Sequence, residues 1–261
     1  MWTPIRPIIN GQANNDMPDM HRKVFYIYLS ECIGTALLVG VGLSVVIFNN
    51  GDGSPIRAWI PDAGTRRALT GLLFGTTGCL ITLSPVGRIS GAHINPIVSI
   101  AFLLKRKISW PHTLGYITAQ MIGSVIGALP LLWWGTWGRS VQYGATLPLP
   151  GRTTAAFIGE TVTSFLLIAG LFFFIGHKKL RRFTPFLIPP LYCLMVWAEG
   201  PLSGTSTNPA RSFGPAVASG IWTDYWLYWI APVLGAVIAV LLFEMPFLWK
   251  WKIKVPKLYQ R

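Results

Sequence analysis

The chain has 261 residues and a net charge of +13, and 52% of its residues are hydrophobic while only 12% are charged. Soluble proteins carry about 25% charged residues, so this composition excludes a soluble domain and a disordered chain. The basic residues form short clusters between long apolar runs, which predicts an integral membrane protein and no nucleic-acid partner.

Six apolar segments lie between a polar tail over residues 1–23 and a basic tail over residues 250–261. The segments are too long for strands and lack the alternation of an outer-membrane barrel, so we expect helices that satisfy their own backbone hydrogen bonds in lipid. The expected spans cover residues 24–48, 68–86, 110–134, 155–175, 184–197 and 225–249. Together they define one membrane domain over residues 24–249.

The distribution of Lys and Arg predicts the orientation of these spans. If the N-terminus is cytoplasmic, 16 of the 22 basic residues face the cytoplasm, five face outward, and Arg211 is left within the membrane domain. Cytoplasmic loops of membrane proteins carry the excess of Lys and Arg. We therefore expect both termini in the cytoplasm and the protein in the cell membrane.

The two halves of the chain carry the same pattern. Glu31 opens the first span and Glu160 lies in the fourth; an Asn-Pro motif follows the second span and another follows the fifth. The repeats cover residues 24–134 and 153–249. Because each repeat has three spans, the second must be inverted relative to the first, and such repeats place their functional site near the membrane midplane.

Each Asn-Pro motif predicts the start of a helix, because Asn is a favoured N-cap and Pro a favoured first helical residue. The helices that begin at Asn95 and Asn208 would end near residues 104 and 219, which is about half a bilayer at 1.5 Å per residue. We expect two re-entrant half-helices that meet at their N-termini. A pair of simple turns is the plainer interpretation, which the matching positions in both repeats disfavour.

The segments Ser90-Gly-Ala-His-Ile-Asn95-Pro96-Ile97 and Asn208-Pro-Ala-Arg-Ser-Phe-Gly-Pro215 closely resemble the two signature loops of aquaporins, the major intrinsic protein family. The first departs from the family pattern in having Ile97 where Ala is usual. The resemblance implies an all-α membrane fold, an hourglass of six transmembrane helices plus two re-entrant half-helices. It also implies a passive channel, not an enzyme, without cofactor, usually assembled as a homotetramer.

The resemblance assigns a role to each motif residue. Asn95 and Asn208 donate to passing water, and Arg211 rejects cations at an outer constriction. Glu31 and Glu160 support the loops, although a membrane carboxylate also fits a proton relay. The motif residues are Asn95, Pro96, Ile97, Asn208, Pro209 and Ala210. The loop residues expected to offer carbonyls to the pore are Gly91, Ala92, His93, Gly204, Ser206 and Thr207.

The family's spacing places the constriction at Gly75, Val196, Thr205 and Arg211. These residues predict a wide filter for water and small uncharged solutes such as glycerol, urea or metalloid hydroxides. Two alternatives stay open: a one-residue shift that brings Phe74 to the constriction of a narrower, water-selective channel, and a packing role for Gly75. Several glycines have the spacing of close helix contacts, namely Gly71, Gly75, Gly78, Gly123 and Gly127.

Other functional classes fit the sequence less well. A proton-coupled transporter also uses inverted repeats and broken helices. It would be distinguished from a passive channel by a saturable flux. A structural adhesion protein of this family would have a blocked pore. A membrane enzyme or metal site needs clustered ligands, whereas the histidines and cysteines are scattered. They are His21, His93, His112, His177, Cys32, Cys79 and Cys193.

Overall fold

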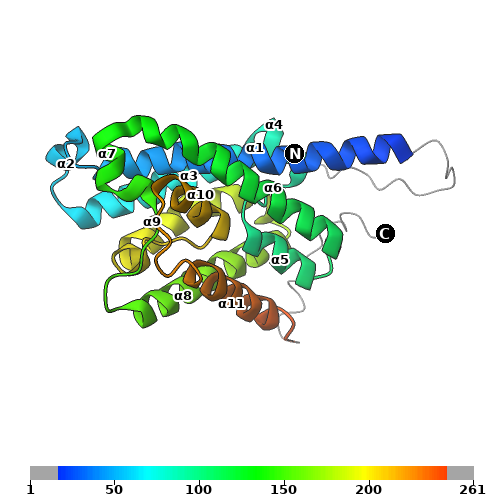
Figure 1. Ribbon diagram of the computed structural model, residues 1–261. Coiled ribbons are helices and arrows are strands. Elements are labelled where there is room, and N and C mark those ends of the chain that lie inside the picture. The colour runs from blue at the N-terminus through cyan, green and yellow to red at the C-terminus, as the bar shows by residue number, and fades with distance from the viewer. Residues whose placement is uncertain (1–16, 246–261) are drawn as a thin grey trace.

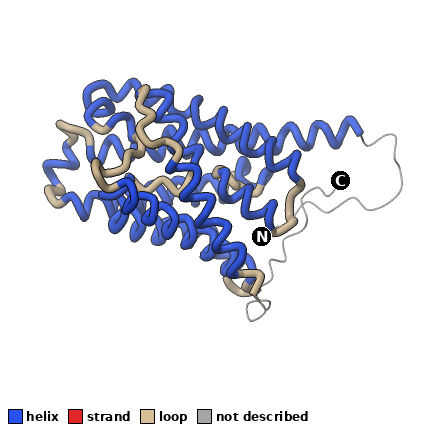
Figure 2. The backbone as a smooth tube through the Cα atoms, turned by 60° about the horizontal axis from the view of Figure 1, so that its bottom comes forward, coloured by secondary structure: helices blue, strands red, loops and turns tan. Residues whose placement is uncertain are grey.

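The structure, a computed structural model, describes residues 17–245, and these residues form helices and loops without any strand (Figures 1 and 2). The α-helices are α1 (Met17–Asn50), α2 (Pro55–Trp59), α3 (Ala63–Leu83), α4 (Pro85–Ser90), α5 (Pro96–Leu104), α6 (Trp110–Ala128), α7 (Gly135–Ser140), α8 (Thr153–Gly176), α9 (Thr184–Ser203), α10 (Pro209–Ser219) and α11 (Leu227–Leu242). The 3₁₀ helices are η1 (Leu129–Trp134), η2 (Gln142–Gly144) and η3 (Arg181–Phe183). This agrees with the all-α fold class predicted from the sequence.

The helix ends differ from the predicted spans where capping residues and prolines decide them. Helix α1 begins at Met17, so residues 17–23 of the expected N-terminal tail are helical, whereas residues 1–16 and 250–261 lie outside the described part. Helix α6 ends at Ala128 and continues as 3₁₀ helix η1, because Pro130 has no N–H for an α-helical bond. Helix α9 continues to Ser203 and ends at Gly204 with a left-handed φ of 82°.

The long helices form two groups of three that pack in the same way. Helix α1 packs against α3 and α6, helix α8 packs against α9 and α11, and α3 joins the groups by packing against α9. The short helix α5 lies between α6 and α11, and the short helix α10 packs mainly against α6 (Figure 1). The second group thus repeats the contacts of the first, and each short helix touches the group to which it does not belong.

Glycine permits the closest of these contacts. A β-carbon at Gly127 of α6 would lie 2.2 Å from the carbonyl oxygen of Ala36 on α1. A β-carbon at Gly71 of α3 would lie 2.3 Å from the carbonyl oxygen of Tyr192 on α9. No side chain fits at these distances, so the predicted packing role of these two glycines is confirmed.

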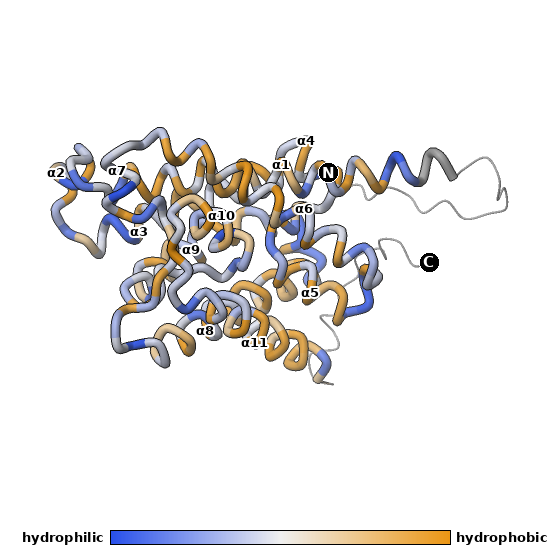
Figure 3. The backbone as a smooth tube through the Cα atoms, in the orientation of Figure 1, coloured by the Kyte–Doolittle hydropathy of each residue, from blue (hydrophilic) through white to orange (hydrophobic). Residues whose placement is uncertain are grey.

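Apolar side chains cover the outside of the helices, and polar side chains lie inside, the reverse of a soluble protein. Exposed apolar residues recur every four positions on the outer faces of three helices: Leu29, Ile33, Leu37 and Val41 on α1, Ile158, Val162 and Leu166 on α8, and Ile230, Leu234 and Ile238 on α11. Glu31, Glu160 and Gln120 are fully buried. Figure 3 shows the apolar character of α11 and α5. Lipid is the solvent that matches this surface.

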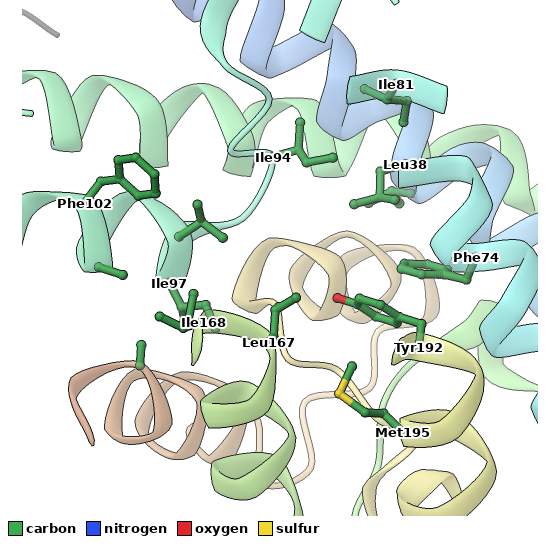
Figure 4. Close-up of a cluster of buried hydrophobic side chains, with 14 of the residues drawn as sticks. Leu38, Phe74, Ile81, Ile94, Ile97, Phe102, Leu167, Ile168, Tyr192 and Met195 are labelled. Atoms are coloured by element: carbon green, nitrogen blue, oxygen red, sulfur yellow. The ribbon is translucent and has the colours of Figure 1, made fainter. Parts of the chain in front are cut away.

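Three stretches of the described chain are long and apolar enough to cross a membrane by length and composition, namely His21–Asn50, Trp110–Ser140 and Thr153–Gly176. Leu227–Leu242 is a shorter apolar helix. Inside the bundle, a large apolar cluster joins α1, α3, α5, α8, α9 and α11 (Figure 4). Ile97 and Phe102 belong to this cluster, which anchors the short helix α5 between the two groups.

Candidate functional site

Each Asn-Pro motif begins a short helix, as the sequence predicts. Asn95 is the N-cap of α5, and its Oδ1 accepts a hydrogen bond of 3.0 Å from the backbone N–H of Ile97. Asn208 is the N-cap of α10, and its Oδ1 accepts from the N–H groups of Ala210 at 3.0 Å and Arg211 at 3.2 Å. Proline follows in both cases, where its missing N–H costs nothing.

The two N-caps also bind each other's loops. The Nδ2 of Asn95 donates to the carbonyl of Thr207 at 2.9 Å, and the Nδ2 of Asn208 donates to the carbonyl of Ile94 at 2.9 Å. Each acceptor is the residue that precedes the other Asn. The N-termini of α5 and α10 therefore meet at a junction with two crossed hydrogen bonds from the Asn side-chain amides. An amide nitrogen carries two hydrogens, so each Asn keeps a second donor.

The loops before the two Asn residues have the same unusual backbone. In the first loop, Ala92 and Ile94 have φ values of 51° and 41°; in the second, Thr205 and Thr207 have φ values of 51° and 50°. Left-handed conformations cost energy in residues with a side chain, and they persist where the surroundings impose them. Alternating left-handed residues give both loops one shape, despite their different sequences.

A buried carboxylate holds each loop in this shape. The carboxylate of Glu31 accepts hydrogen bonds from the N–H groups of His93 at 2.9 Å and Ile94 at 2.7 Å. The carboxylate of Glu160 accepts from the N–H groups of Ser206 at 2.5 Å and Thr207 at 2.8 Å. The bonded residues are the same two positions before each Asn. Both carboxylates use their lone pairs on loop backbone, which suits a support role better than a proton relay.

Arg211 lies in the first turn of α10, directly after the second motif. Its side chain is 5% exposed, and its Nη1 donates to the carbonyl of Gly144 at 2.6 Å. Its Cζ lies 5.9 Å from the ring centre of Phe74 on α3. A buried guanidinium is costly in a membrane protein unless it faces carbonyls, an aromatic ring or water. Two of these partners are present here.

Phe74 also lies beside Tyr192 of α9, with 5.6 Å between the ring centres (Figure 4). The Tyr192 hydroxyl lies 2.7 Å from the Oγ1 of Thr207, the residue whose carbonyl receives the Asn95 amide. The two rings thus connect Arg211 to Thr207 of the junction through successive contacts. We call Phe74 and Tyr192 the aromatic pair.

The residues predicted to form the constriction differ in where they point. A β-carbon at Gly75 would lie 2.8 Å from the Cα of Pro189, so this position faces α9, and the adjacent Phe74 lies beside Arg211. This orientation is the one-residue shift that the sequence leaves open, and it agrees with a packing role for Gly75. Val196 is half-buried next to Gly71, and Thr205 is 3% exposed in the second loop.

The His93 ring is packed rather than free to bind a ligand. Its Nδ1 lies 3.0 Å from the Oγ of Ser99, and the ring contacts Phe102 and Tyr116. Within residues 17–245, no group of three metal-ligating side chains comes together. Ile97 is fully buried in the apolar cluster, and both crossed hydrogen bonds of the Asn amides are formed. A side chain larger than the usual Ala at this position therefore does not separate α5 from α10.

Sequence reasoning missed two residues of this region. Tyr192 lies one helical turn before Val196 on the same face of α9, a spacing that indicates it. Glu199 lies three residues after Val196, and an ionisable residue inside a predicted span is itself a signal. Its carboxylate is 5% exposed and accepts a hydrogen bond from Thr205.

Comparison with known proteins agrees with the fold and the junction. The family model of the major intrinsic protein matches residues 20–243. The chain belongs to the major intrinsic protein family. Aquaporin TIP4-3 of Zea mays is 34% identical over 243 residues, which cover 91% of this chain and 91% of that protein. The probable aquaporin NIP7-1 of Arabidopsis thaliana is 37% identical over 166 residues, 63% of this chain and 60% of the relative.

The chain thus spans less than two thirds of the length of the Arabidopsis relative. Among solved structures, the aquaglyceroporin from Plasmodium falciparum superposes with a TM-score of 0.66 and 21% identity, covering 86% of this chain and 97% of that chain. At this identity the likeness shows the fold alone. The two plant relatives are aquaporins by name, and this chain belongs to the same family.

Proposed function

We propose that this protein is a passive channel for water and small uncharged solutes that excludes ions and protons. The observation that carries this proposal is the junction of α5 and α10, where two Asn side chains cap the helices and donate across to each other's loops. Two helix N-termini place positive partial charge at one point, which repels cations and protons. The second amide hydrogen of each Asn supplies a donor to a passing water.

The proposed selectivity filter lies on the Arg211 side of this junction. Its polar members are Arg211 and Thr205, and its apolar members are Val196 and Phe74, since Gly75 faces α9. Arg211 supplies fixed charge against cations and donors for polar solutes. The loop carbonyls supply acceptors, because the alternating left-handed backbone turns successive peptide groups in different directions.

The proposed orientation and assembly follow the sequence. We place both termini in the cytoplasm and the protein in the cell membrane, because that arrangement gives the excess of Lys and Arg to the cytoplasmic side. A homotetramer with one path in each subunit is the proposed assembly, which the family resemblance implies. Protease protection of tagged termini and crosslinking in native membranes test these two points.

Stopped-flow light scattering on proteoliposomes tests the transport function. Wild-type protein should speed the uptake of water and of at least one of glycerol, urea and arsenite, with a rate linear in solute concentration. Saturable flux that stops with an uncoupler would assign a transporter instead, and water flux alone would assign a water-selective channel. Planar bilayers should carry no single-channel current, whereas Arg211→Val should keep most water flux and admit a proton leak.

A further inference from the structure

Glu199 is a third carboxylate in the interior of the helical bundle, and the junction described above does not use it. Its side chain is 5% exposed, and its Oε2 accepts a hydrogen bond of 2.5 Å from the Oγ1 of Thr205. The other oxygen, Oε1, is buried and receives no hydrogen bond from any residue that the structure describes. A buried carboxylate in a membrane domain is costly, so its presence calls for a function.

The contacts of Glu199 exclude the support role of the other two carboxylates. Glu31 and Glu160 each accept two hydrogen bonds from loop N–H groups. The hydrogen bond that Glu199 accepts comes from the Thr205 hydroxyl, whereas the backbone N–H of Thr205 donates to the Oγ of Ser203 at 3.1 Å. Glu199 therefore does not hold the two N–H groups before an Asn-Pro motif in the way that Glu31 and Glu160 do.

The inverted repeat supplies a natural control for this pair. When Ser90-Gly91 is aligned with Ser203-Gly204, Val86 corresponds to Glu199 and Ala92 to Thr205. Ala92 and Thr205 have the same φ of 51°. The first loop thus adopts its shape with an apolar pair at the two positions. Glu199 and Thr205 therefore form a polar pair that only the second repeat has, and the shape of the loop does not require it.

Helix α8 leaves room for this polar pair. A β-carbon at Gly159 would lie 2.7 Å from the Cγ of Glu199 and 2.8 Å from its Oε1. Because Gly159 has no side chain, the Glu199 carboxylate can lie against α8. The hydrogen bond between them runs from the Oγ1 of Thr205 to the Oε2 of Glu199, so Thr205 is its donor. A hydroxyl has one proton and two lone pairs, and Thr205 therefore offers only lone pairs to any other partner.

We infer that Glu199 is a positioning residue that fixes Thr205 as a hydrogen-bond acceptor of the filter, which also contains the donor Arg211, and so favours solutes that carry hydroxyl donors. This inference rests on the proposed channel function and on Thr205 belonging to its filter. Arg211 can only donate. A donor and a fixed acceptor together replace the hydration of a small polyol or a metalloid hydroxide, which must both give and receive hydrogen bonds.

The test measures the ratio of glycerol to water permeability in proteoliposomes for wild type, Glu199→Gln, Thr205→Val and the double variant. Glutamine keeps the size of the side chain, but its amide can donate to Thr205 and release the hydroxyl proton toward the path. We expect Glu199→Gln to lower the ratio about 2- to 10-fold, the range expected for losing one hydrogen bond. Water permeability should fall less than glycerol permeability, because a water molecule can reorient to accept a hydrogen bond from the released hydroxyl.

The double variant distinguishes positioning from a general structural role. If Glu199 acts through Thr205, Glu199→Gln should change nothing further once Thr205→Val has removed the hydroxyl, whereas Thr205→Ser should keep a ratio near that of wild type. Glu244→Gln is the matched control, since this carboxylate is 59% exposed and pairs with Lys105. It should leave the ratio unchanged.

The outcomes separate this inference from the proposed function. Wild type that conducts neither water nor glycerol overturns both, and wild type that conducts water but excludes glycerol overturns the selection for hydroxylated solutes. If wild type conducts both, an unchanged ratio in Glu199→Gln refutes the inference alone. Additive effects in the double variant refute it as well. Midpoints of thermal unfolding in detergent identify any variant whose low flux comes from misfolding, and Thr205→Ser against Thr205→Val then decides the role of the hydroxyl.

Discussion

Replacing Glu160 with Leu should destabilise the protein far more than the loss of an exposed carboxylate would, because two buried N–H groups depend on it. The carboxylate is fully buried and accepts hydrogen bonds from the backbone of Ser206 and Thr207 and from the Oγ of Ser203 at 2.6 Å. Leaving a buried donor without an acceptor costs about 1–3 kcal/mol, so the two N–H groups alone account for roughly 2–6 kcal/mol.

That loss is a large part of a typical folding free energy, which is about 5–15 kcal/mol. Glu160→Gln should cost less, because the amide oxygen of Gln still accepts one of the bonds. The assay is thermal unfolding of the purified protein in detergent, followed by intrinsic fluorescence and size-exclusion chromatography. A domain of this size shifts by about 2–4 °C for each kcal/mol, so Glu160→Leu should lower the midpoint by roughly 4–24 °C.

The inverted repeat supplies a second measurement and a control. Glu31→Leu should lower the midpoint by a similar amount, since its carboxylate holds His93 and Ile94 in the same way. Glu244→Leu, at an exposed carboxylate, should leave it nearly unchanged. If Glu160→Leu unfolds at the wild-type temperature, the carboxylate does not hold the second loop, and the support role is refuted.

Three further predictions concern the proposed filter, the helix contacts and the start of α3. Phe74→Ala should raise glycerol permeability more than water permeability in proteoliposomes, because the ring lies beside Arg211 and narrows the proposed filter. Equal changes in the two permeabilities would place Phe74 outside the path. Gly127→Val should lower the unfolding midpoint through about 1–3 kcal/mol of overpacking against α1, whereas Gly78→Ala, with no neighbour nearer than 3.8 Å, should not. Hydrogen bonds from Thr65 lower the pKa of the Asp62 carboxyl at the start of α3. The ionised carboxylate therefore stabilises the fold at pH values above its ordinary pKa, and this stabilisation is lost as the pH falls through the lowered pKa. Asp62→Asn should flatten that part of the curve of unfolding midpoint against pH, and a curve identical to that of wild type would contradict the capping role.

Local chemistry made the two short helices predictable from the sequence. Asn followed by Pro specifies a capped helix start in any context, so α5 and α10 begin where the motifs are and end at Leu104 and Ser219. The meeting of their N-termini followed from the inverted repeat, because two half-helices that enter from opposite faces have no other common point.

The filter was harder to predict, because it depends on how a helix is rotated about its axis. Successive residues of a helix differ by about 100° in direction, so Phe74 and Gly75 face different neighbours although they are adjacent. Only the close contact of α3 with α9 decides that Gly75 faces Pro189 and Phe74 faces Arg211. Glu199 carries no signal of the repeat, because its counterpart in the first repeat is Val86.

The crossed amides also impose an order on biosynthesis. The Nδ2 of Asn95 bonds a carbonyl 112 residues further along the chain, so this amide has no partner while the ribosome is still making the second half. During that interval its Asn amide needs water or a lipid headgroup, since an unmet polar group inside lipid is costly. A first half that inserts before the second would keep this amide hydrated, and the crossed hydrogen bonds can form only once the loop before α10 has been made.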